Sequence, residues 1–185
     1  MLPKNLRILI ISLIFLLILG VMQFTVPYII GFDGYYNIKH ADIIKKQGFK
    51  DFPWVENTIL DNNYANLQIL FHILLIPFTF LGSGAKIASI LFTTLAFVVF
   101  YWFLTENKIK YAFFWSLLYL FTAETLTYRF MLPRQMPLVI SLLLLTIYFL
   151  QRKKYLFLGI TSLIFVLLHT SFIFQILIII LYFIL

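Results

Sequence analysis

Long apolar stretches without a charged side chain divide this chain of 185 residues. The first, from Ile8 to Ile30, is long enough to cross a bilayer, which takes roughly 20 apolar residues. Because lipid offers the backbone no hydrogen-bond partners, a crossing segment of this kind must satisfy its N–H and C=O groups internally, as a helix does. Further uncharged runs cover residues 62–85, 87–105, 111–123, 135–151 and 155–185. The pattern predicts an all-α, polytopic transmembrane helix bundle with about five to six spans.

Composition agrees with this prediction. Hydrophobic residues make up 63% of the chain and charged residues only 11%, whereas soluble domains have about 25% charged residues. The net charge is +7, but the cations lie in short clusters between apolar runs, where they set orientation and contact anionic headgroups, so nucleic-acid binding is not expected. The chain has no cysteine, which excludes disulfides and thiolate metal sites. The apolar stretch after the basic N-terminus is too long for a signal peptide, so we expect an uncleaved first span.

Charge placement sets the expected orientation. Residues 67–81 cover roughly 22 Å as a helix, less than the ~30 Å hydrocarbon core, which predicts an interfacial or re-entrant helix. With the N-terminus inside, the basic segments "TENKIK" and "QRKKY" then also lie inside, as short basic loops should. If residues 67–81 cross instead, both segments move outside. The first arrangement leaves Asp33 outside with three cations on the unfavoured side, Lys86, Arg129 and Arg134. An anionic ligand is one reason for cations to lie there.

Residues 31–66 are the longest segment between spans and are predicted to form an outer loop. Within it, "YYNIKHADIIKKQGF" favours an amphipathic helix that shares Tyr36, Ile43 and Ile44 on one face and ends at Gly48. The segment "DFPW" at residues 51–54 predicts a turn whose aromatic residues suit the headgroup region.

The last apolar run is too long for one ordinary span, and "HTS" at residues 169–171 divides it. We expect an outward span, a turn near His169 and the start of a returning span. Because the run reaches Leu185 with no polar flank, we expect residues 1–185 to be a single transmembrane domain from the N-terminal part of a longer bundle.

Asp33 is the first carboxylate of the chain and follows the first span directly. At the membrane surface it can meet a substrate whose tail lies in lipid and whose head lies in water. Such a carboxylate could take the proton of an acceptor hydroxyl that attacks a phosphate-linked sugar. It could equally cap the helix that begins near Gly34, and spacing alone leaves both interpretations open.

Arg129 and Arg134 flank "FMLP" at the outer mouth of two predicted spans. Guanidinium groups bind phosphate in a bidentate manner, although arginines there can also reach ordinary lipid phosphates. Glu124 lies within a predicted apolar span, where an acidic residue needs a partner. Arg129, about one helical turn away, is the expected partner. A structural ion pair and a role in the site both stay open.

The histidines His40, His72 and His169 show no metal-ligand spacing, so zinc is not expected. His72 fits a hydrogen-bonded interface residue better than a catalyst and is kept as a candidate substrate contact. Tyr35 and Tyr36 follow Asp33 closely and are candidate sugar or lipid contacts. No glycine-rich phosphate loop is present, so a nucleotide cofactor is not supported.

The segment "FDGYYNIKHADIIKKQGFKDFPW" resembles the first outer loop of GT-C-type membrane glycosyltransferases, which include the catalytic subunit of oligosaccharyltransferase and related archaeal and bacterial proteins. The order of elements is similar over essentially the whole chain, about the first half of a typical member. The resemblance implies inverting transfer of a sugar or glycan from a polyprenyl-phosphate-linked donor to an acceptor on the outer face of a membrane. It further implies that this membrane is the cell membrane of a prokaryote. It also implies that Asp33 matches the catalytic aspartate of that loop.

The chain departs from this family at "YRFMLPRQMPL", where many members carry another acidic residue in a second outer loop. Arg134 and Gln135 occupy that place here. The departure does not support a divalent metal shared between two loops, and it suits a metal-independent transfer or a protein that has lost activity. The alternative from another class is a transporter or flippase for lipid-linked sugar, or a non-catalytic membrane subunit.

Overall fold

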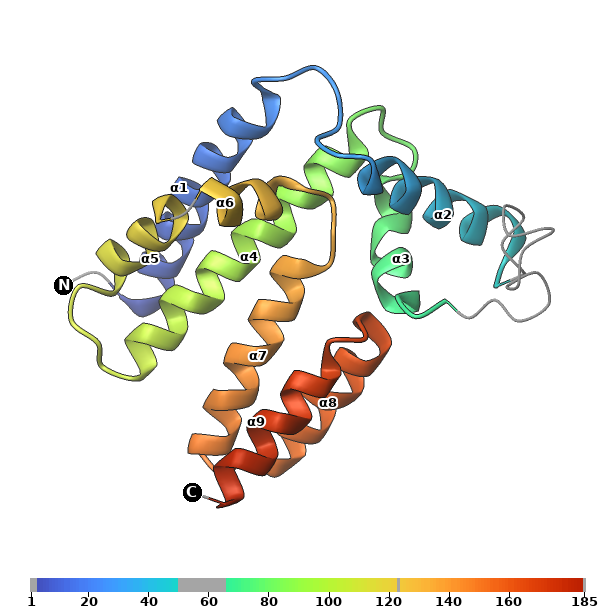
Figure 1. Ribbon diagram of the computed structural model, residues 1–185. Helices are drawn as coiled ribbons and strands as arrows, with labels where there is room; N and C mark the ends of the chain where they lie inside the picture. The colour runs from blue at the N-terminus through green and yellow to red at the C-terminus, as the bar shows by residue number, and fades with distance from the viewer. Residues whose placement is uncertain (1–2, 50–65, 123, 185) are drawn as a thin grey trace.

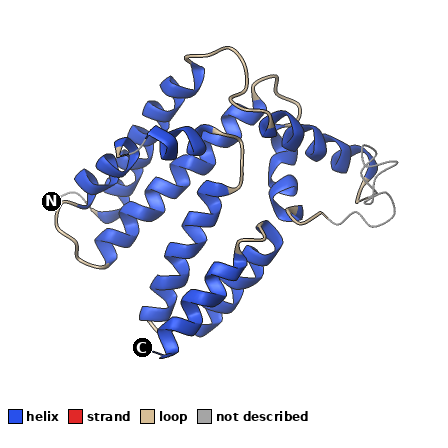
Figure 2. Ribbon diagram, in the orientation of Figure 1, coloured by secondary structure: helices blue, strands red, loops and turns tan. Residues whose placement is uncertain are grey.

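The computed structural model describes residues 3–49, 66–122 and 124–184. Every regular element in these residues is a helix, and no strand occurs among them (Figure 2). The prediction of an all-α fold is therefore confirmed. The turn predicted at residues 51–54 lies outside the described residues.

Two helices are long and apolar enough to cross a membrane. They are α1 (Lys4–Phe24) and α4 (Gly84–Glu106), which lie side by side in opposite directions (Figure 1). Their contact includes the stacked rings of Phe15 and Phe97, whose centroids are 4.8 Å apart and which are both fully buried. Helices of this length and composition belong in a lipid bilayer, and this is the organisation of a membrane protein.

A third candidate span is broken in the middle. Helices α6 (Glu124–Met131) and α7 (Met136–Gln151) meet at 107° across a break at residues 132–135. The remaining apolar helices are shorter: α5 (Ala112–Phe121), α8 (Tyr155–Leu168) and α9 (Phe172–Ile184). The described residues thus hold two to three spans by length, fewer than the predicted five to six. The difference arises because an uncharged run is not always one helix: the run from Tyr111 breaks after ten helical residues, about 15 Å.

Polar side chains of α1 and α4 hold the broken helix in place. Thr93 Oγ1 donates to the carbonyl of Phe130 at 2.6 Å, and Ser89 Oγ donates to that of Met131 at 2.9 Å. Gln23 Nε2 from α1 donates to the same Met131 carbonyl at 3.2 Å. Carbonyls freed by a helix break are costly in an apolar interior unless side chains satisfy them. These bonds therefore fix the position of the segment 132–135 that follows.

Between α1 and α4 lie α2 (Asp33–Gln47) and α3 (Ile69–Leu75), which continues into the short 3₁₀ helix η2 (Ile76–Phe78). Gly48 ends α2 with φ 74°, as predicted. The predicted helix is correct, and Ile43 and Ile44 are buried on one face. Tyr36 is more exposed, but its ring contacts those of the buried His40 and His72. The buried residues of this helix are Gly34, Asn37, His40, Ala41, Ile43 and Ile44. Helix α3 has seven residues, far fewer than a crossing helix needs.

Contacts at the opposite end of the bundle decide between the two arrangements of the basic segments. Lys4 forms an ion pair with Glu106, and Arg152 Nη2 donates to the Glu106 carbonyl at 3.0 Å. The N-terminus and both basic segments therefore share one end, as they do only if α3 does not cross. The predicted turn near His169 is also confirmed, because α8 ends at Leu168 and α9 begins at Phe172.

Candidate functional site

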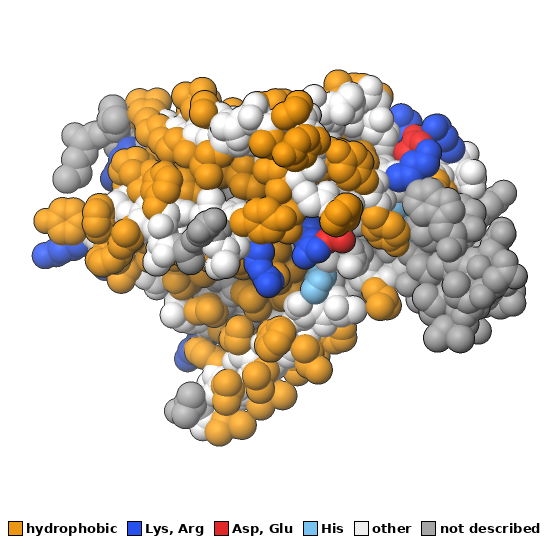
Figure 3. All heavy atoms as spheres, turned by 45° about the horizontal axis from the view of Figure 1, so that its top comes forward, with side chains coloured by type: hydrophobic (Ala, Val, Ile, Leu, Met, Phe, Trp, Pro, Cys, Tyr) orange, Lys and Arg blue, Asp and Glu red, His pale blue; other side chains and the backbone are white. Residues whose placement is uncertain are grey.

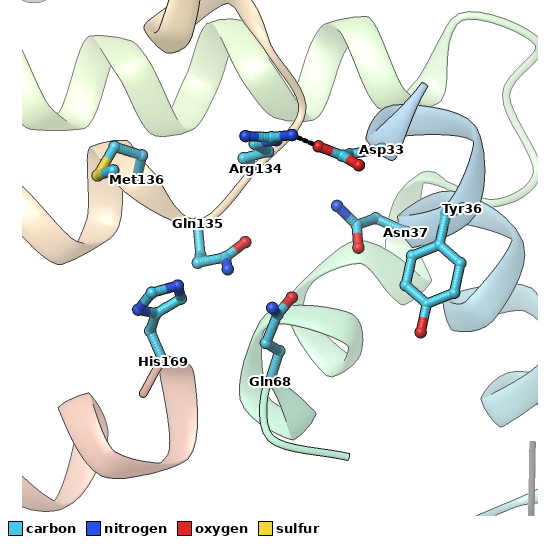
Figure 4. Close-up of a pocket in the computed structure, with 8 residues that line it drawn as sticks. All are labelled: Asp33, Tyr36, Asn37, Gln68, Arg134, Gln135, Met136 and His169. Atoms are coloured by element: carbon cyan, nitrogen blue, oxygen red, sulfur yellow. Dashed lines mark ion pairs between the residues drawn. The ribbon is translucent and has the colours of Figure 1, made fainter. Parts of the chain in front are cut away.

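An ion pair between Asp33 and Arg134 lies at the end of the bundle opposite these basic segments (Figures 1 and 4). Asp33 is the first residue of α2, and Arg134 belongs to the break between α6 and α7. Both side chains are partly exposed, Arg134 to 44% and Asp33 to 42%. The start of α2 and the break between α6 and α7, which are about 100 residues apart in the sequence, thus meet at this ion pair.

Glycines allow the two segments to come so close. A Cβ atom at Gly34 would lie 2.8 Å from Pro133 Cγ and 2.5 Å from Ile29 Cγ2. At Gly31, with φ 75°, it would lie 2.5 Å from Leu132 Cδ2. The first turn of α2 therefore packs directly on the break between α6 and α7.

The helix-cap interpretation of Asp33 is wrong. The N-cap of α2 is Phe32, and no side-chain hydrogen bond caps this helix. Asp33 is instead the first helical residue, and its carboxylate faces the guanidinium of Arg134. The carboxylate is thus available to the site and not committed to the helix end.

One cavity, of about 320 Å³, opens on one side of this ion pair. We call it the amide cavity. Besides Asp33 and Arg134, its lining consists of Tyr36, Asn37, Gln68, Gln135, Met136 and His169. Figure 4 shows these side chains converging from α2, the start of α3, the start of α7 and the end of α8. The volume lies at the lower end of the ~300–1,000 Å³ typical of small-molecule sites.

A second cavity, of about 400 Å³, opens on the other side of the same ion pair. We call it the arginine cavity. Besides Asp33 and Arg134, its lining consists of Gly31, Phe32, Thr125, Tyr128, Arg129 and Leu132. Arg129 comes from α6, so the structure brings together three of the charged residues singled out from the sequence, Asp33, Arg129 and Arg134. Figure 3 shows a patch of basic, acidic and histidine side chains within a largely hydrophobic face.

Two candidate residues lie elsewhere or cannot be placed. Tyr35 lines neither of these two cavities; its hydroxyl accepts a hydrogen bond from the Ile29 N–H at 3.3 Å. Together with Tyr36 it lines a third cavity, of about 620 Å³, so its role as a sugar or lipid contact stays a prediction. Glu124 is the first residue of α6 and not an interior residue of an apolar span, so that expectation is wrong. Its side chain lies outside the described part of the chain.

His72 supports the site indirectly, through Asn37. The side chain is buried and lines neither cavity, contrary to its selection as a substrate contact. Its Nε2 lies 3.3 Å from Asn37 Oδ1, and Asn37 Nδ2 donates to the Pro133 carbonyl at 3.0 Å. Burial, together with the nearby His40, lowers the pKa of His72 to about 3. A neutral His72 thus holds Asn37, and Asn37 holds the break that carries Arg134.

The two histidines of this support touch each other. The rings of His40 and His72 lie 4.1 Å apart between centroids, and burial also lowers the pKa of His40. Burial and the neighbouring ring both disfavour a proton on either imidazole, so protonation of this pair weakens the support.

Sequence reasoning missed several lining residues, namely Asn37, Gln68, Gln135, Met136 and His169. Two of them had a usable signal: Asn37 lies one helical turn after Asp33, and Gln135 adjoins Arg134. His169 was assigned only to a turn. Nothing in the sequence distinguishes Gln68.

Lys86 does not belong to the site, although it was expected outside with the two arginines. The side chain is 3% exposed, and its ammonium donates to the carbonyls of Gln23, at 3.3 Å, and Val26. It also lies 5.1 Å from the centre of the Phe24 ring. Lys86 therefore satisfies the C-terminal end of α1, which explains this cation without an anionic ligand.

Within the described residues, no three His, Cys, Asp or Glu side chains gather where they could hold a metal ion. The chain matches no protein-family model, no curated protein and no solved structure. The two cavities and the ion pair between them are therefore the features that bear on its function.

Proposed function

We propose that this protein is a membrane glycosyltransferase that moves a sugar from a polyprenyl-phosphate-linked donor to an acceptor hydroxyl at the outer membrane surface. The observation that carries the proposal is the Asp33–Arg134 ion pair, which lies between two cavities, one of which holds a second cation, Arg129. The proposal includes α5, α8 and α9 as further membrane helices, which brings the bundle to the five to six spans that the sequence predicts.

The arginine cavity suits the donor phosphate. Arg129 and Arg134 both line it, and guanidinium groups bind phosphate oxygens through paired hydrogen bonds. Phe32 and Tyr128 at this cavity are exposed aromatic residues, 93% and 54% accessible. Such side chains suit the level where a lipid tail leaves the headgroup region.

The chemistry follows from these positions. The acceptor hydroxyl oxygen attacks the anomeric carbon and forms the new glycosidic bond, while the bond from that carbon to the phosphate oxygen breaks. The phosphate leaves with the electron pair, and the hydroxyl proton passes to the Asp33 carboxylate. Arg129 and Arg134 stabilise the charge that develops on the leaving phosphate.

Arg134 has two possible partners in this proposal, the Asp33 carboxylate and the donor phosphate. Without donor, its guanidinium faces Asp33. A donor phosphate in the arginine cavity competes with the carboxylate for this guanidinium. In our proposal the exchange leaves Asp33 able to accept the hydroxyl proton once the donor is bound.

The test is Asp33→Asn, assayed in membranes with a panel of radiolabelled polyprenyl-phosphate sugars. Transfer out of the donor lipid is followed by thin-layer chromatography, and donor retention is measured separately. We expect transfer to fall by about 10²–10⁴-fold while donor retention persists. Asp42→Asn is the matched control, because Asp42 is a surface carboxylate paired with Lys39 and Lys46.

The same variant separates the enzyme from a carrier. Movement of labelled lipid-linked sugar across the membrane that survives in Asp33→Asn, with no bond cleavage in either protein, would favour the transporter and end the glycosyltransferase proposal.

A further inference from the structure

The two cavities beside the ion pair differ in chemistry. Beyond the shared pair, the arginine cavity adds a cation, whereas the amide cavity adds three neutral amides, a histidine, a tyrosine and a methionine. An amide side chain both donates and accepts hydrogen bonds, which matches a hydroxyl group, since a hydroxyl also does both. A phosphate only accepts at neutral pH and is better served by the arginine side.

His169 presents a defined donor to the amide cavity. Its Nδ1 accepts a hydrogen bond from the Ser171 N–H at 2.9 Å, which places the proton of the neutral ring on Nε2. Partial burial lowers the pKa of His169, so the ring is neutral near physiological pH. Nε2–H is then a donor that no described residue is seen to engage.

Gln135 is a second polar group at the amide cavity. It is 7% exposed and immediately precedes α7, and its main-chain carbonyl accepts the Val139 N–H at 3.0 Å, which fixes the backbone that carries this side chain. Figure 4 shows its amide with those of Gln68 and Asn37 around one space, with the Tyr36 ring beside Asn37. Several hydrogen-bonding groups on fixed elements beside an aromatic ring can orient a ligand rich in hydroxyl groups.

We propose that the amide cavity binds a sugar unit of the acceptor, held by Gln135, Gln68 and the Nε2–H of His169. This inference rests on the proposed function, since it assigns the acceptor side of that reaction. In this arrangement the acceptor hydroxyl approaches Asp33 from the amide cavity, and the donor phosphate contacts Arg134 from the arginine cavity. The ion pair then marks the boundary across which the sugar is transferred.

The test is direct binding, measured by saturation-transfer difference NMR on the protein in lipid nanodiscs. Nanodiscs avoid sugar-based detergents, which would compete for the site. The probes are methyl glycosides of glucose, galactose, mannose and N-acetylglucosamine. We expect saturation transfer to at least one of them, reduced about fivefold or more by Gln135→Leu and by His169→Phe, as for the loss of one hydrogen bond.

Arg129→Gln is the matched control, because Arg129 lines only the other cavity. It should leave glycoside binding unchanged while weakening retention of a polyprenyl phosphate. Size-exclusion profiles and thermal unfolding of each variant check the fold. If Gln135→Leu does not fold, His169→Phe decides alone.

Two results would overturn the inference: no glycoside of the panel binds, or binding survives in a folded His169→Phe variant. The outcome is independent of the assay for transfer. Glycoside binding that depends on His169 in a protein whose transfer does not need Asp33 would keep the sugar site and reject the proposed reaction. Loss of transfer in Asp33→Asn without any glycoside binding would do the reverse.

Discussion

Lys86 and Arg134 are cations at the same end of the bundle, but they are satisfied in different ways. Lys86 is buried and donates to main-chain carbonyls at the end of α1. Arg134 is partly exposed, pairs with a carboxylate from a distant segment and borders two cavities. A charge on the unfavoured side of a membrane protein therefore does not by itself indicate a ligand. What matters is whether the protein already satisfies the charge.

Among the variants that compare these two cations, the largest expected effect is on transfer in Arg134→Gln. Loss of a charge that stabilises the leaving group should lower the transfer rate by about 10²–10³-fold. The unfolding temperature should change little, because an ion pair this exposed contributes about 0–1 kcal/mol. Initial transfer rates and thermal unfolding of the same samples check the two parts. A variant that loses both together would place Arg134 among the structural residues, with Lys86.

Lys86→Met should show the opposite behaviour. The substitution leaves the carbonyls of Gln23 and Val26 without this donor in a buried place, which costs about 1–3 kcal/mol of unfolding free energy. Transfer per folded molecule should be preserved. Lys108→Met, at an exposed position just after α4, is the control and should leave stability unchanged. A folded Lys86→Met protein with no transfer would mean that Lys86 also serves the site.

Gly34→Ala tests the close packing that brings Asp33 to Arg134. The new methyl group would overlap Pro133 and Ile29, and overpacking of this kind costs about 1–3 kcal/mol. Transfer should fall as well, because relief of the overlap moves α2 away from the break. Gly20→Ala is the control, since a Cβ there meets nothing within 4 Å. Equal behaviour of the two variants would show that this packing does not position the ion pair.

The smallest expected effect is a pH dependence of stability that arises from His72, in the support beneath Arg134. His72 is neutral in the folded protein down to about pH 3, whereas in the unfolded chain it takes up a proton near pH 6.5. The unfolded state therefore binds more protons below pH 6.5. As the pH falls below this value, the free energy of unfolding decreases by up to about 1.4 kcal/mol per pH unit. Thermal unfolding between pH 7.5 and 5 should show this loss, and His72→Gln should reduce it. An unchanged slope would assign the loss to other groups, His40 first.

Local sequence predicted the helices better than the spans. The uncharged run after Ile8 and the run before Glu106 became long helices, because each stays uncharged and mostly apolar over the length of a span. The run from Tyr111 did not, since its helix ends at Phe121 and a new one begins at Glu124. The sequence pattern did not reveal that the buried face of α2 carries the polar Asn37 and His40. Their partners, His72 and Pro133, are distant in the chain.

By itself, the sequence determined an all-helical membrane protein, because hydropathy acts through local chain composition, and its charges favoured an arrangement with the basic segments at one end. It also marked Asp33, Arg129 and Arg134 as charges that needed explanation. Only the tertiary structure decided that Lys86 is satisfied by backbone while Arg134 meets Asp33, and that Gln68, Gln135 and His169 share one cavity. These facts depend on which distant segments pack together, and packing is set by the whole bundle and not by any one stretch of it.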